Sequence, residues 1–260
     1  MRIPEWLPDF LQRKLRAYRY RGDSFLCPVC GYHGRALAPI GFDVDVLKEK
    51  QVSGAGRRNA GCFNCGVIDR ERLVHVYLRD VLGIYDRTRS SRILHIAPDE
   101  HITRILGRSG ALEYVCGDKF AEGYAYAANV RTMDVEDLPF NSDHFDLVIC
   151  NHVLEHVPDD ARAMREILRV LKPGGHAVLQ VPLSANSPKT IEDPSITDPK
   201  ERERVYGQFD HLRLYGQDYG DRLKAAGFIV ERLQLARQKE FERYGLNPDE
   251  DLFVGVKPGA

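Results

Sequence analysis

Between residues 145 and 182 the apolar positions change from a continuous run to a helical spacing and back. Phe145 to Cys150 is a short apolar run, typical of a strand buried on both faces of a parallel sheet. Lys172 to Gly175 is a turn sequence that ends a helix, and Ala177 to Val181 is the next apolar run. Between them, Pro158 starts a helix with one apolar face: Met164, Ile167, Leu168 and Leu171. The pattern predicts a β–α–β unit, which places its ligand at the carboxyl ends of the strands.

The same pattern predicts further elements on both sides of this unit. A helix begins at Asp99 and ends near Gly110, and another spans Gln217 to Ala226, closed by Gly227. Apolar runs predict strands at Ile93–Ala97, Tyr114–Gly117, a segment ending at Thr132–Asp134, Phe228–Leu235 and Leu252–Lys257. Strands that alternate with helices predict an α/β domain over residues 91–260.

The first third of the chain has a different pattern. Residues 4–20 predict a short amphipathic helix whose basic face is a solvated surface or contacts an anionic partner. Its apolar stripe consists of Trp6, Phe10, Leu11 and Leu15. Residues 68–86 predict a second helix, with His75 on its surface and not bound to a metal. We therefore divide the chain into an N-terminal helix (1–21), a small module (22–67), a linking helix (68–90) and the α/β domain.

The six cysteines fall into two groups. Cys116 and Cys150 lie in apparent strands, where we expect them to be small buried residues. The other four form two CxxCG motifs, and two such turns supply the thiolates that structural zinc prefers: Cys27, Cys30, Cys62 and Cys65. Disulfides and a redox CxxC are the alternatives; nothing in the sequence points to secretion, and two matched pairs argue against a redox motif. The long interval between the pairs predicts an inserted segment.

The charged residues are balanced over the whole chain but not over its first third. The formal net charge of the 260 residues is −1, which gives no general case for binding nucleic acid or a membrane. Residues 1–80, however, hold 14 Lys and Arg against 9 Asp and Glu. No apolar segment approaches the length of a membrane span, and the start of the sequence lacks the apolar core of a signal peptide. We expect a cytoplasmic protein without a membrane span.

Two segments resemble the class I S-adenosylmethionine-dependent methyltransferases, in the type 11-like branch. FDLVICNHVLEHV resembles the fourth strand and following loop of that family, and LRVLKPGGHAVLQVP resembles its turn and fifth strand. The upstream LPFNSDHFD makes the combination more specific. The resemblance implies a Rossmann-like, seven-stranded, mostly parallel sheet, with the seventh strand antiparallel between the fifth and the sixth.

The resemblance implies S-adenosylmethionine as the cofactor and places its contacts. Asp118 ends the second strand, where a carboxylate accepts hydrogen bonds from both ribose hydroxyls. Asp134 and the backbone of Val135 would lie beside the adenine, and Asn151 follows the fourth strand. The glycine-rich first motif of the family is altered here, because His95 replaces its acidic residue. The resemblance implies cofactor contacts for His95 and for the residues that follow: Ala97, Pro98, Asp99 and Glu100. Asp99 or Glu100 would bind the ammonium group of the cofactor.

Two groups of polar residues are candidates for the acceptor site. His152 and His156 follow the fourth strand, and Gly207 to Gly216 lies where the family places substrate-binding elements. We predict that His152 or His211 acts as the base that a hydroxyl acceptor needs at neutral pH. Substrate contacts are predicted for His156, Asp210, Arg213 and Tyr215. The alternative for each histidine is a structural role. The polar segment Ser187 to Pro194 is predicted to be a lid or a substrate-binding loop.

Nearly the whole chain also resembles a bacterial group of methyltransferase-domain proteins with an N-terminal CPxCG zinc ribbon. This resemblance rests on RNAxCxxCG at Arg58, RxRL at Arg70, LHIAP at Leu94 and the Gly207 to Gly216 run. Three functions remain open. The leading one is methylation of a small molecule or a saccharide, with O-methylation favoured. The others are RNA methylation, in which the basic first third binds the phosphate backbone, and a non-catalytic binding protein with the same fold.

Overall fold

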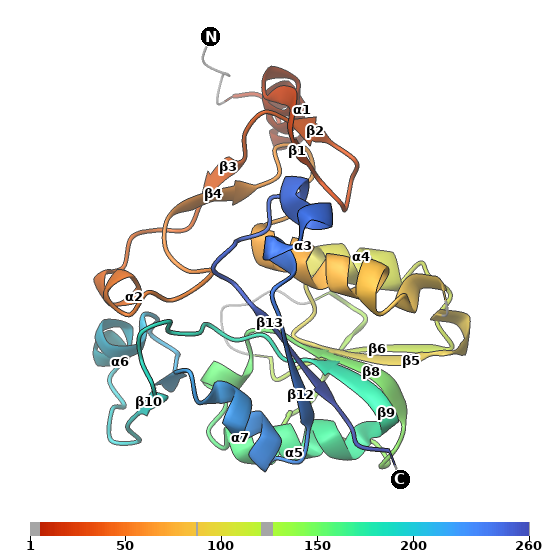
Figure 1. Ribbon diagram of the computed structural model, residues 1–260, viewed down its shortest axis with the longest axis vertical. Coiled ribbons are helices and arrows are strands. Elements are labelled where there is room, and N and C mark those ends of the chain that lie inside the picture. Colours follow the sequence, from red (N-terminus) through yellow and green to blue (C-terminus); the bar gives the residue numbers. More distant parts are fainter. Residues whose placement is uncertain (1–5, 87, 121–126, 260) are drawn as a thin grey trace.

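A seven-stranded sheet forms the centre of the computed structural model, which describes residues 6–86, 88–120 and 127–259 (Figure 1). The strands pair in the order β12 (Ile229–Leu233), β13 (Leu252–Val256), β9 (Leu171–Val178), β8 (Phe145–Cys150), β5 (Arg92–Ile96), β6 (Glu113–Asp118) and β7 (Val130–Thr132). β13 runs antiparallel to both of its neighbours, and the other pairs are parallel. This topology confirms the predicted fold class.

Helices cover both faces of the sheet because consecutive strand residues point to opposite sides. In β5, Leu94 and Ile96 join the core formed with α5 (Asp160–Val170) and α7 (Tyr219–Ala225). Ile93, the residue before Leu94, joins the core on the other face, under α3 (Asp69–Val76) and α4 (Glu100–Leu106). β5 and β8 are therefore buried on both faces, as their continuous apolar runs predict.

Some boundaries differ from the sequence-based expectation. β9 begins at Leu171, which the sequence predicts to end the preceding helix, and it includes the predicted turn, because Gly174 N–H donates to Lys257 O and the pairing with β8 takes an irregular register. The linking helix is α3 followed by a π-helical turn, η1 (Tyr77–Val81), and the short 3₁₀ segments η2 (Ile84–Asp86) and η3 (Thr88–Ser90). The prediction that His75 lies on the helix surface is wrong: its ring is buried between Tyr85 Oη and the carbonyl of Pro28.

The N-terminal module consists of two small hairpins. β1 (Arg21–Leu26) pairs with β2 (His33–Gly34), and β3 (Ala38–Ile40) pairs with β4 (Arg58–Gly61), all antiparallel. α1 (Asp9–Arg19) precedes them and is shorter than the predicted helix, whose first two residues lie outside the described part of the chain. Much of the predicted apolar stripe is exposed: Trp6 is 81% and Phe10 61% accessible. Figure 1 places the hairpins above the edge of the sheet where α3 and α4 begin.

The segment between the two cysteine pairs extends from the N-terminal module to the part of the α/β domain that contains α6. It contains α2 (Asp45–Glu49), which Figure 1 places beside α6 (Pro199–Tyr206). Val52 forms an isolated antiparallel bridge with Ser184, and Ser53 N–H donates to Leu183 O at 3.0 Å. The insertion therefore packs on the chain that leaves the carboxyl end of β9.

Between β9 and α7, residues 191–214 form a small subdomain, called here the polar subdomain. It holds the two-stranded pair β10 (Ile191–Glu192) and β11 (Arg213–Leu214), with α6 between them. The remaining short helical turns are η4 (Leu154–His156), after β8, and η5 (Leu235–Arg237) and η6 (Lys239–Tyr244), between β12 and β13. Among the described residues, no helix is long and apolar enough to cross a membrane.

Candidate functional site

The sulfur atoms of the four predicted metal ligands converge in the N-terminal module. Cys27 Sγ lies 3.8 Å from Cys65 Sγ, Cys30 Sγ lies 3.8 Å from Cys62 Sγ, and all four sulfurs lie within 4.8 Å of one another. All six cysteines of the chain are described, and none forms a disulfide. Thiolates about 2.3 Å from a zinc ion form a tetrahedron with edges of about 3.8 Å. The cluster therefore fits a tetrahedral zinc site.

Hydrogen bonds within the cluster shift the cysteine pKa values in opposite directions. A hydrogen bond with Cys27 is the main reason that the pKa of Cys62 falls to about 7, whereas hydrogen bonds to the other cysteines raise the pKa values of Cys27 and Cys65. Arg72 is fully buried beside the cysteines, and its guanidinium donates to the carbonyls of Ala60 and Val67, each at 2.8 Å. Burial lowers the pKa of Arg72, and the charge of Cys27 opposes that shift. A buried cation suits four thiolates around a divalent ion, which together carry a net negative charge.

The altered first motif turns at the carboxyl end of β5. Ala97 has φ +48°, a conformation that favours glycine, and its N–H donates to Gly117 O at 2.9 Å. His95 is buried, with Nδ1 2.9 Å from Tyr114 Oη, and burial lowers its pKa to about 3. This neutral ring cannot replace the acidic residue of the family as a partner for an ammonium group.

The two carboxylates that follow this turn face away from each other. Asp99 caps α4 by accepting from Ile102 N–H at 2.8 Å, and it lies with Glu71 and His101 in a polar cluster. Burial raises the pKa of Asp99 to about 6. The side chain of Glu100 is 84% exposed and is 3.9 Å from Arg104. Asp99 thus caps α4 and Glu100 is solvated, and binding of the ammonium group by either carboxylate stays a prediction.

The predicted ribose and adenine residues lie at the next two strand ends. Asp118 ends β6, where its carboxylate accepts one hydrogen bond, at 3.3 Å, from Phe120 N–H. Asp134 follows β7, pairs with Lys119 Nζ at 2.8 Å and accepts from Glu136 N–H. Val135 beside it is buried in the core. Asp118 therefore retains acceptor capacity, whereas Asp134 must share its carboxylate with a lysine.

The chain leaves β8 in a strained turn that brings polar atoms together. His152 has φ +54°, and its N–H donates to Gln180 O at 2.7 Å. Its Nδ1 lies 3.5 Å from Glu155 Oε1, and Glu155 is 1% exposed. Burial and the neighbouring charge of Arg70 lower the pKa of His152. Burial opposes the ionisation of Glu155, but His152 and the nearby imidazoles lower its pKa overall. The environment thus favours a neutral His152 beside a carboxylate.

The predicted histidine of the second group reaches the same place. His211, which is 2% exposed, packs edge-to-face against His156, with ring centroids 4.7 Å apart. His156 Nδ1 lies 3.3 Å from Asp210 Oδ2. Glu155, His156 and His211 each offer a ligand atom, and these atoms lie within 4.8 Å of one another. The structure therefore brings both groups of candidate residues together at the carboxyl end of β8.

Several buried polar atoms at this place lack a hydrogen-bond partner of good geometry. The atoms are Asn151 Oδ1, His152 Nε2, Glu155 Oε2, Asp210 Oδ1 and both ring nitrogens of His211. Leaving one buried polar atom unpaired costs about 1–3 kcal/mol. Such a concentration within one site is typical of groups that meet water, an ion or a substrate.

Arg213 and Tyr215, for which contacts with substrate are predicted, make structural contacts within the protein. Arg213 is buried, and its guanidinium donates to Glu192 and to the carbonyls of Leu154, Val157 and Pro158. Tyr215 Oη is buried 2.8 Å from Asp160 Oδ2. Because these polar atoms are already satisfied, the two residues fix the loop after β8 onto the polar subdomain.

Tyr215→Phe should therefore lower stability without changing cofactor binding. The substitution removes the hydroxyl that bonds to Asp160 and Leu154 O, so we expect the free energy of unfolding to fall by about 1–2 kcal/mol. Urea denaturation measures this change, with Tyr18→Phe, at an exposed position in α1, as the control. Unchanged stability would return Tyr215 to the list of candidate substrate residues.

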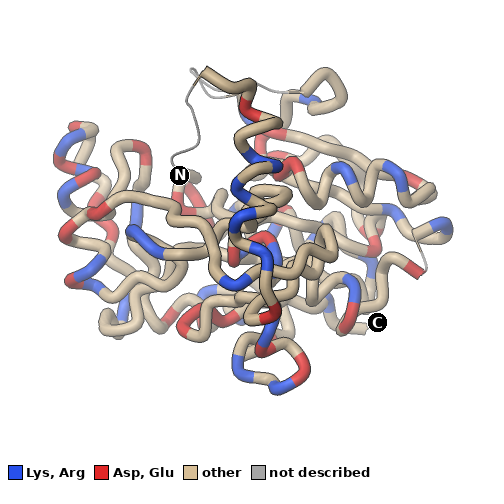
Figure 2. Tube along the Cα trace, turned by 90° about the horizontal axis from the view of Figure 1, so that it is seen from above, with Lys and Arg blue, Asp and Glu red and all other residues tan. Residues whose placement is uncertain are grey.

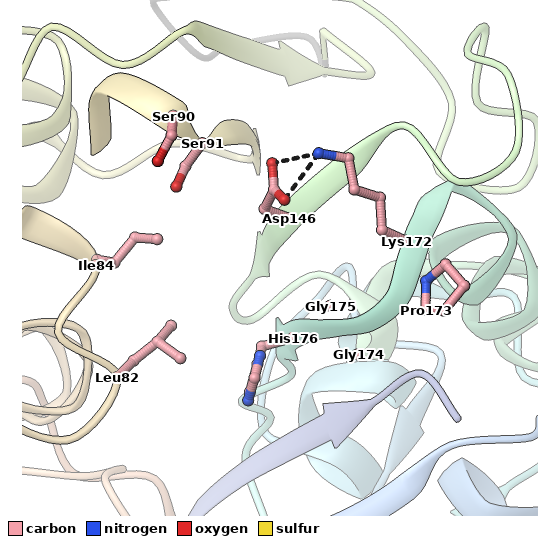
Figure 3. A pocket seen from close by; sticks show the side chains of 10 residues that line it. All are labelled: Leu82, Ile84, Ser90, Ser91, Asp146, Lys172, Pro173, Gly174, Gly175 and His176. Atoms are coloured by element: carbon pink, nitrogen blue, oxygen red, sulfur yellow. Dashed lines mark hydrogen bonds and ion pairs between the residues drawn. The ribbon is translucent and has the colours of Figure 1, made fainter. Parts of the chain in front are cut away.

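A separate pocket lies at the opposite edge of the sheet. Figure 3 shows it at the amino ends of β8 and β9, between Leu82 and Ile84 on one side and Lys172 and His176 on the other. Lys172 Nζ is 2.8 Å from both carboxylate oxygens of Asp146. Because parallel α/β sheets bind ligands at the carboxyl ends of their strands, this pocket is not the candidate site.

Sequence reasoning gave no role in the site to two residues that act there. Glu155 lies between the two histidines of the β8 loop, three positions from His152, so its spacing on a helical turn was an available signal. Arg70 lies in the first turn of α3, and its charge acts on both His152 and Glu250. Nothing in the local sequence indicates that contact, because it depends on how the linking helix packs on the sheet.

Comparisons with known proteins match part of the α/β domain. Residues 99–179 match the family described as "Methyltransferase domain". A 2-phytyl-1,4-naphtoquinone methyltransferase of Synechococcus elongatus is 40% identical over 73 residues, 28% of this chain and 31% of the relative. A ubiquinone biosynthesis O-methyltransferase of Alkalilimnicola ehrlichii is 45% identical over 49 residues, 18% of this chain and 20% of the relative. The chain thus spans less than a third of the length of these relatives.

A solved structure of 1,6-didemethyltoxoflavin-N1-methyltransferase from Burkholderia thailandensis, with S-adenosylhomocysteine bound, is also similar. The identity is 17%, the TM-score is 0.44, and the match covers 73% of this chain and 87% of that one. The strand order itself defines the fold of the α/β domain. Residues 99–179 match the methyltransferase domain family, and the sheet to which they contribute strands has the topology of the class I S-adenosylmethionine-dependent methyltransferases.

Proposed function

We propose that this chain is an S-adenosylmethionine-dependent methyltransferase that methylates a hydroxyl group of a small molecule. The observation that supports this most is the convergence of unpaired polar atoms from Asn151, His152 and His211 at the carboxyl end of β8, a strand that lies within the residues matching the methyltransferase family. In an α/β sheet of this kind, the carboxyl ends of the strands are the expected ligand site.

The residues at the strand ends fit the cofactor. Asp118 offers a carboxylate with spare acceptor capacity for the ribose hydroxyls, and Ala97 takes a glycine-like turn that exposes the backbone of the first motif. Asn151 Oδ1 is an unpaired acceptor for a donor group of the cofactor. When bound there, S-adenosylmethionine would supply a methyl group already activated by its sulfonium.

The protein then has to hold the acceptor and remove its proton. His152 is suited to the second task because Nε2 is unpaired, the pKa is lowered and the side chain is 18% exposed. Glu155, 3.5 Å from Nδ1, would orient the ring. Ser184 and the insertion between the cysteine pairs border the same edge of the sheet and would limit the size of the acceptor.

The other acceptors considered from the sequence have less support. The two curated relatives described above are named for quinone substrates, which favours a small molecule over a saccharide. RNA binding would favour an extended basic surface. Figure 2 shows Lys and Arg interspersed with Asp and Glu along the trace. We also propose that the four-cysteine cluster binds structural zinc.

Calorimetric titration with S-adenosylhomocysteine tests the cofactor site. Asp118→Ala should weaken binding by about 1–3 kcal/mol, because a charge-assisted hydrogen bond to the ribose is lost. Asp221→Ala, at an exposed position in α7, is the matched control and should bind normally. If the wild-type protein has no measurable affinity for S-adenosylhomocysteine or S-adenosylmethionine, the non-catalytic alternative becomes the better hypothesis.

A further inference from the structure

Some of the unpaired atoms near the carboxyl end of β8 belong to residues that could bind a metal ion. Glu155 Oε2 and both ring nitrogens of His211 are buried and lack a hydrogen-bond partner of good geometry. His156 is held at the same place by its contact with Asp210, and its side chain is 33% exposed. Glu155 and His211 are only 1% and 2% exposed, so two of the three potential ligands are almost completely removed from solvent.

The separation of these groups is close to that of ligands on one ion. Atoms bound at about 2.1 Å lie about 3.0 Å apart when adjacent and about 4.2 Å apart when opposite. The ligand atoms of Glu155, His156 and His211 lie within 4.8 Å of one another, so a small contraction would bring them onto one ion. The backbone already restrains them, since Leu212 N–H donates to Glu155 O at 2.8 Å across the two segments.

The charges at this place also suit a cation. Glu155 offers a carboxylate and His211 an imidazole, and their ligand atoms lie in one cluster with that of His156. Asp210 adds a second negative charge beside His156. Two imidazoles and one carboxylate are a ligand set for first-row transition metals, and they leave coordination positions open for substrate.

We propose that Glu155, His156 and His211 bind a divalent transition-metal ion that holds the acceptor hydroxyl. This second metal site is separate from the four-cysteine cluster and uses oxygen and nitrogen ligands. Metal binding itself does not depend on the proposed methyl transfer, whereas the catalytic role of the ion rests on it. As a Lewis acid, the ion would lower the pKa of the bound hydroxyl.

The proton balance assigns different tasks to the two predicted catalytic histidines. The hydroxyl proton passes to His152 Nε2, and the oxygen keeps the electron pair with which it bonds to the methyl carbon. The bond between that carbon and the sulfonium sulfur breaks, and its electron pair remains on sulfur. His211 is then a ligand, which agrees with its greater burial, and His152 is the base.

Zinc stoichiometry of the full-length chain tests the second site. After equilibrium dialysis against zinc, the wild type should hold two ions per chain, one at the cysteines and one at Glu155, His156 and His211. Glu155→Gln and His211→Gln should each hold one, with affinity for the second ion lowered more than about 100-fold, beyond the usual effect of losing a supporting contact. His33→Gln, at an exposed histidine next to Asp23, should still hold two.

Several outcomes would overturn the proposal. A wild-type protein that takes up only one zinc, and does not bind manganese or cobalt at a second site, would mean that ordered water satisfies these atoms. Equal binding by wild type and Glu155→Gln would also contradict it. His156→Gln provides a second check if the buried variants do not fold, because its side chain is partly exposed.

Cofactor titration separates this inference from the proposed function. Binding of S-adenosylhomocysteine without a second metal ion would reject the metal site and leave methyl transfer possible. A second metal ion without any cofactor binding would support the site and reject the methyltransferase function.

Discussion

Cys62→Ser should release the zinc of the four-cysteine cluster and unfold the N-terminal module. The core of this module is small, and two of the cysteines are part of it: Ala17, Phe25, Cys27, Tyr32, Cys62 and Val67. Structural zinc contributes about 10–16 kcal/mol in apparent binding free energy to modules of this kind at neutral pH. With one ligand removed, little else would hold the two turns together.

Loss of this zinc ion should also destabilise the adjoining part of the α/β domain, through Arg72. Its guanidinium is buried between carbonyls of the module and the carbonyl of Gly245 in the domain. Without the negative cluster, this cation would remain buried with less charge compensation, which is destabilising. We therefore expect greater hydrogen exchange in β4 and at the start of α3 as well as in the two hairpins.

Metal analysis and hydrogen exchange provide the measurements. Cys116→Ser is the matched control, because Cys116 is buried in β6 outside the cluster and should leave the zinc content unchanged. Retention of this zinc by Cys62→Ser, or wild-type protein isolated with disulfides among the four cysteines, would contradict the prediction.

The sheet was largely predictable because its central strands are continuous apolar segments with distinct ends. Phe145 to Cys150 is β8 as expected, and Leu252 to Val256 forms the antiparallel strand β13. The four-cysteine cluster was predictable for a similar reason: the spacing within each CxxCG motif fixes a local turn. In both cases the information lies in neighbouring residues.

Roles that depend on distant contacts were not predictable. Arg213 resembles a surface residue that could bind a substrate, but its partners include Leu154 O, more than fifty positions earlier. His75 is buried because Pro28, in the first cysteine turn, packs over α3. The sequence around Glu155 gives little indication of a role in the site. Only the structure shows that its carboxylate lies next to His211, which comes from the polar subdomain.

The arrangement of the two parts gives the zinc module a position next to the first motif. His101, in the helix that follows this motif, donates from Nε2 to Cys65 O at 3.1 Å, and its other nitrogen lies 3.3 Å from Glu71. Hydrogen bonding to Glu71 raises the pKa of His101. The module is therefore attached to the helix whose first turn, capped by Asp99, borders the proposed cofactor site.

The strongest effect on catalysis is expected from His152→Gln. If His152 removes the acceptor proton, turnover should fall by about 10²–10⁴-fold, while affinity for S-adenosylhomocysteine stays near that of wild type. The acceptor has to be identified first, by incubating cell extracts with methyl-labelled cofactor and following the label into metabolites. His144→Gln, at the start of β8 and paired with Glu113 at 2.7 Å, is a control outside the site.

The pH dependence provides a second, independent readout for His152. A histidine normally titrates near 6.5, and burial together with Arg70 lowers the pKa of His152. A base must be neutral, so wild-type turnover should stay constant as the pH falls through 6.5 and decrease only at lower pH. The Gln variant has no titrating group at this position, and its residual rate should lack this acid limb. Near-normal turnover by the variant with the true acceptor, or an unchanged pH profile, would mean that the site acts by positioning alone and that His152 has a structural role.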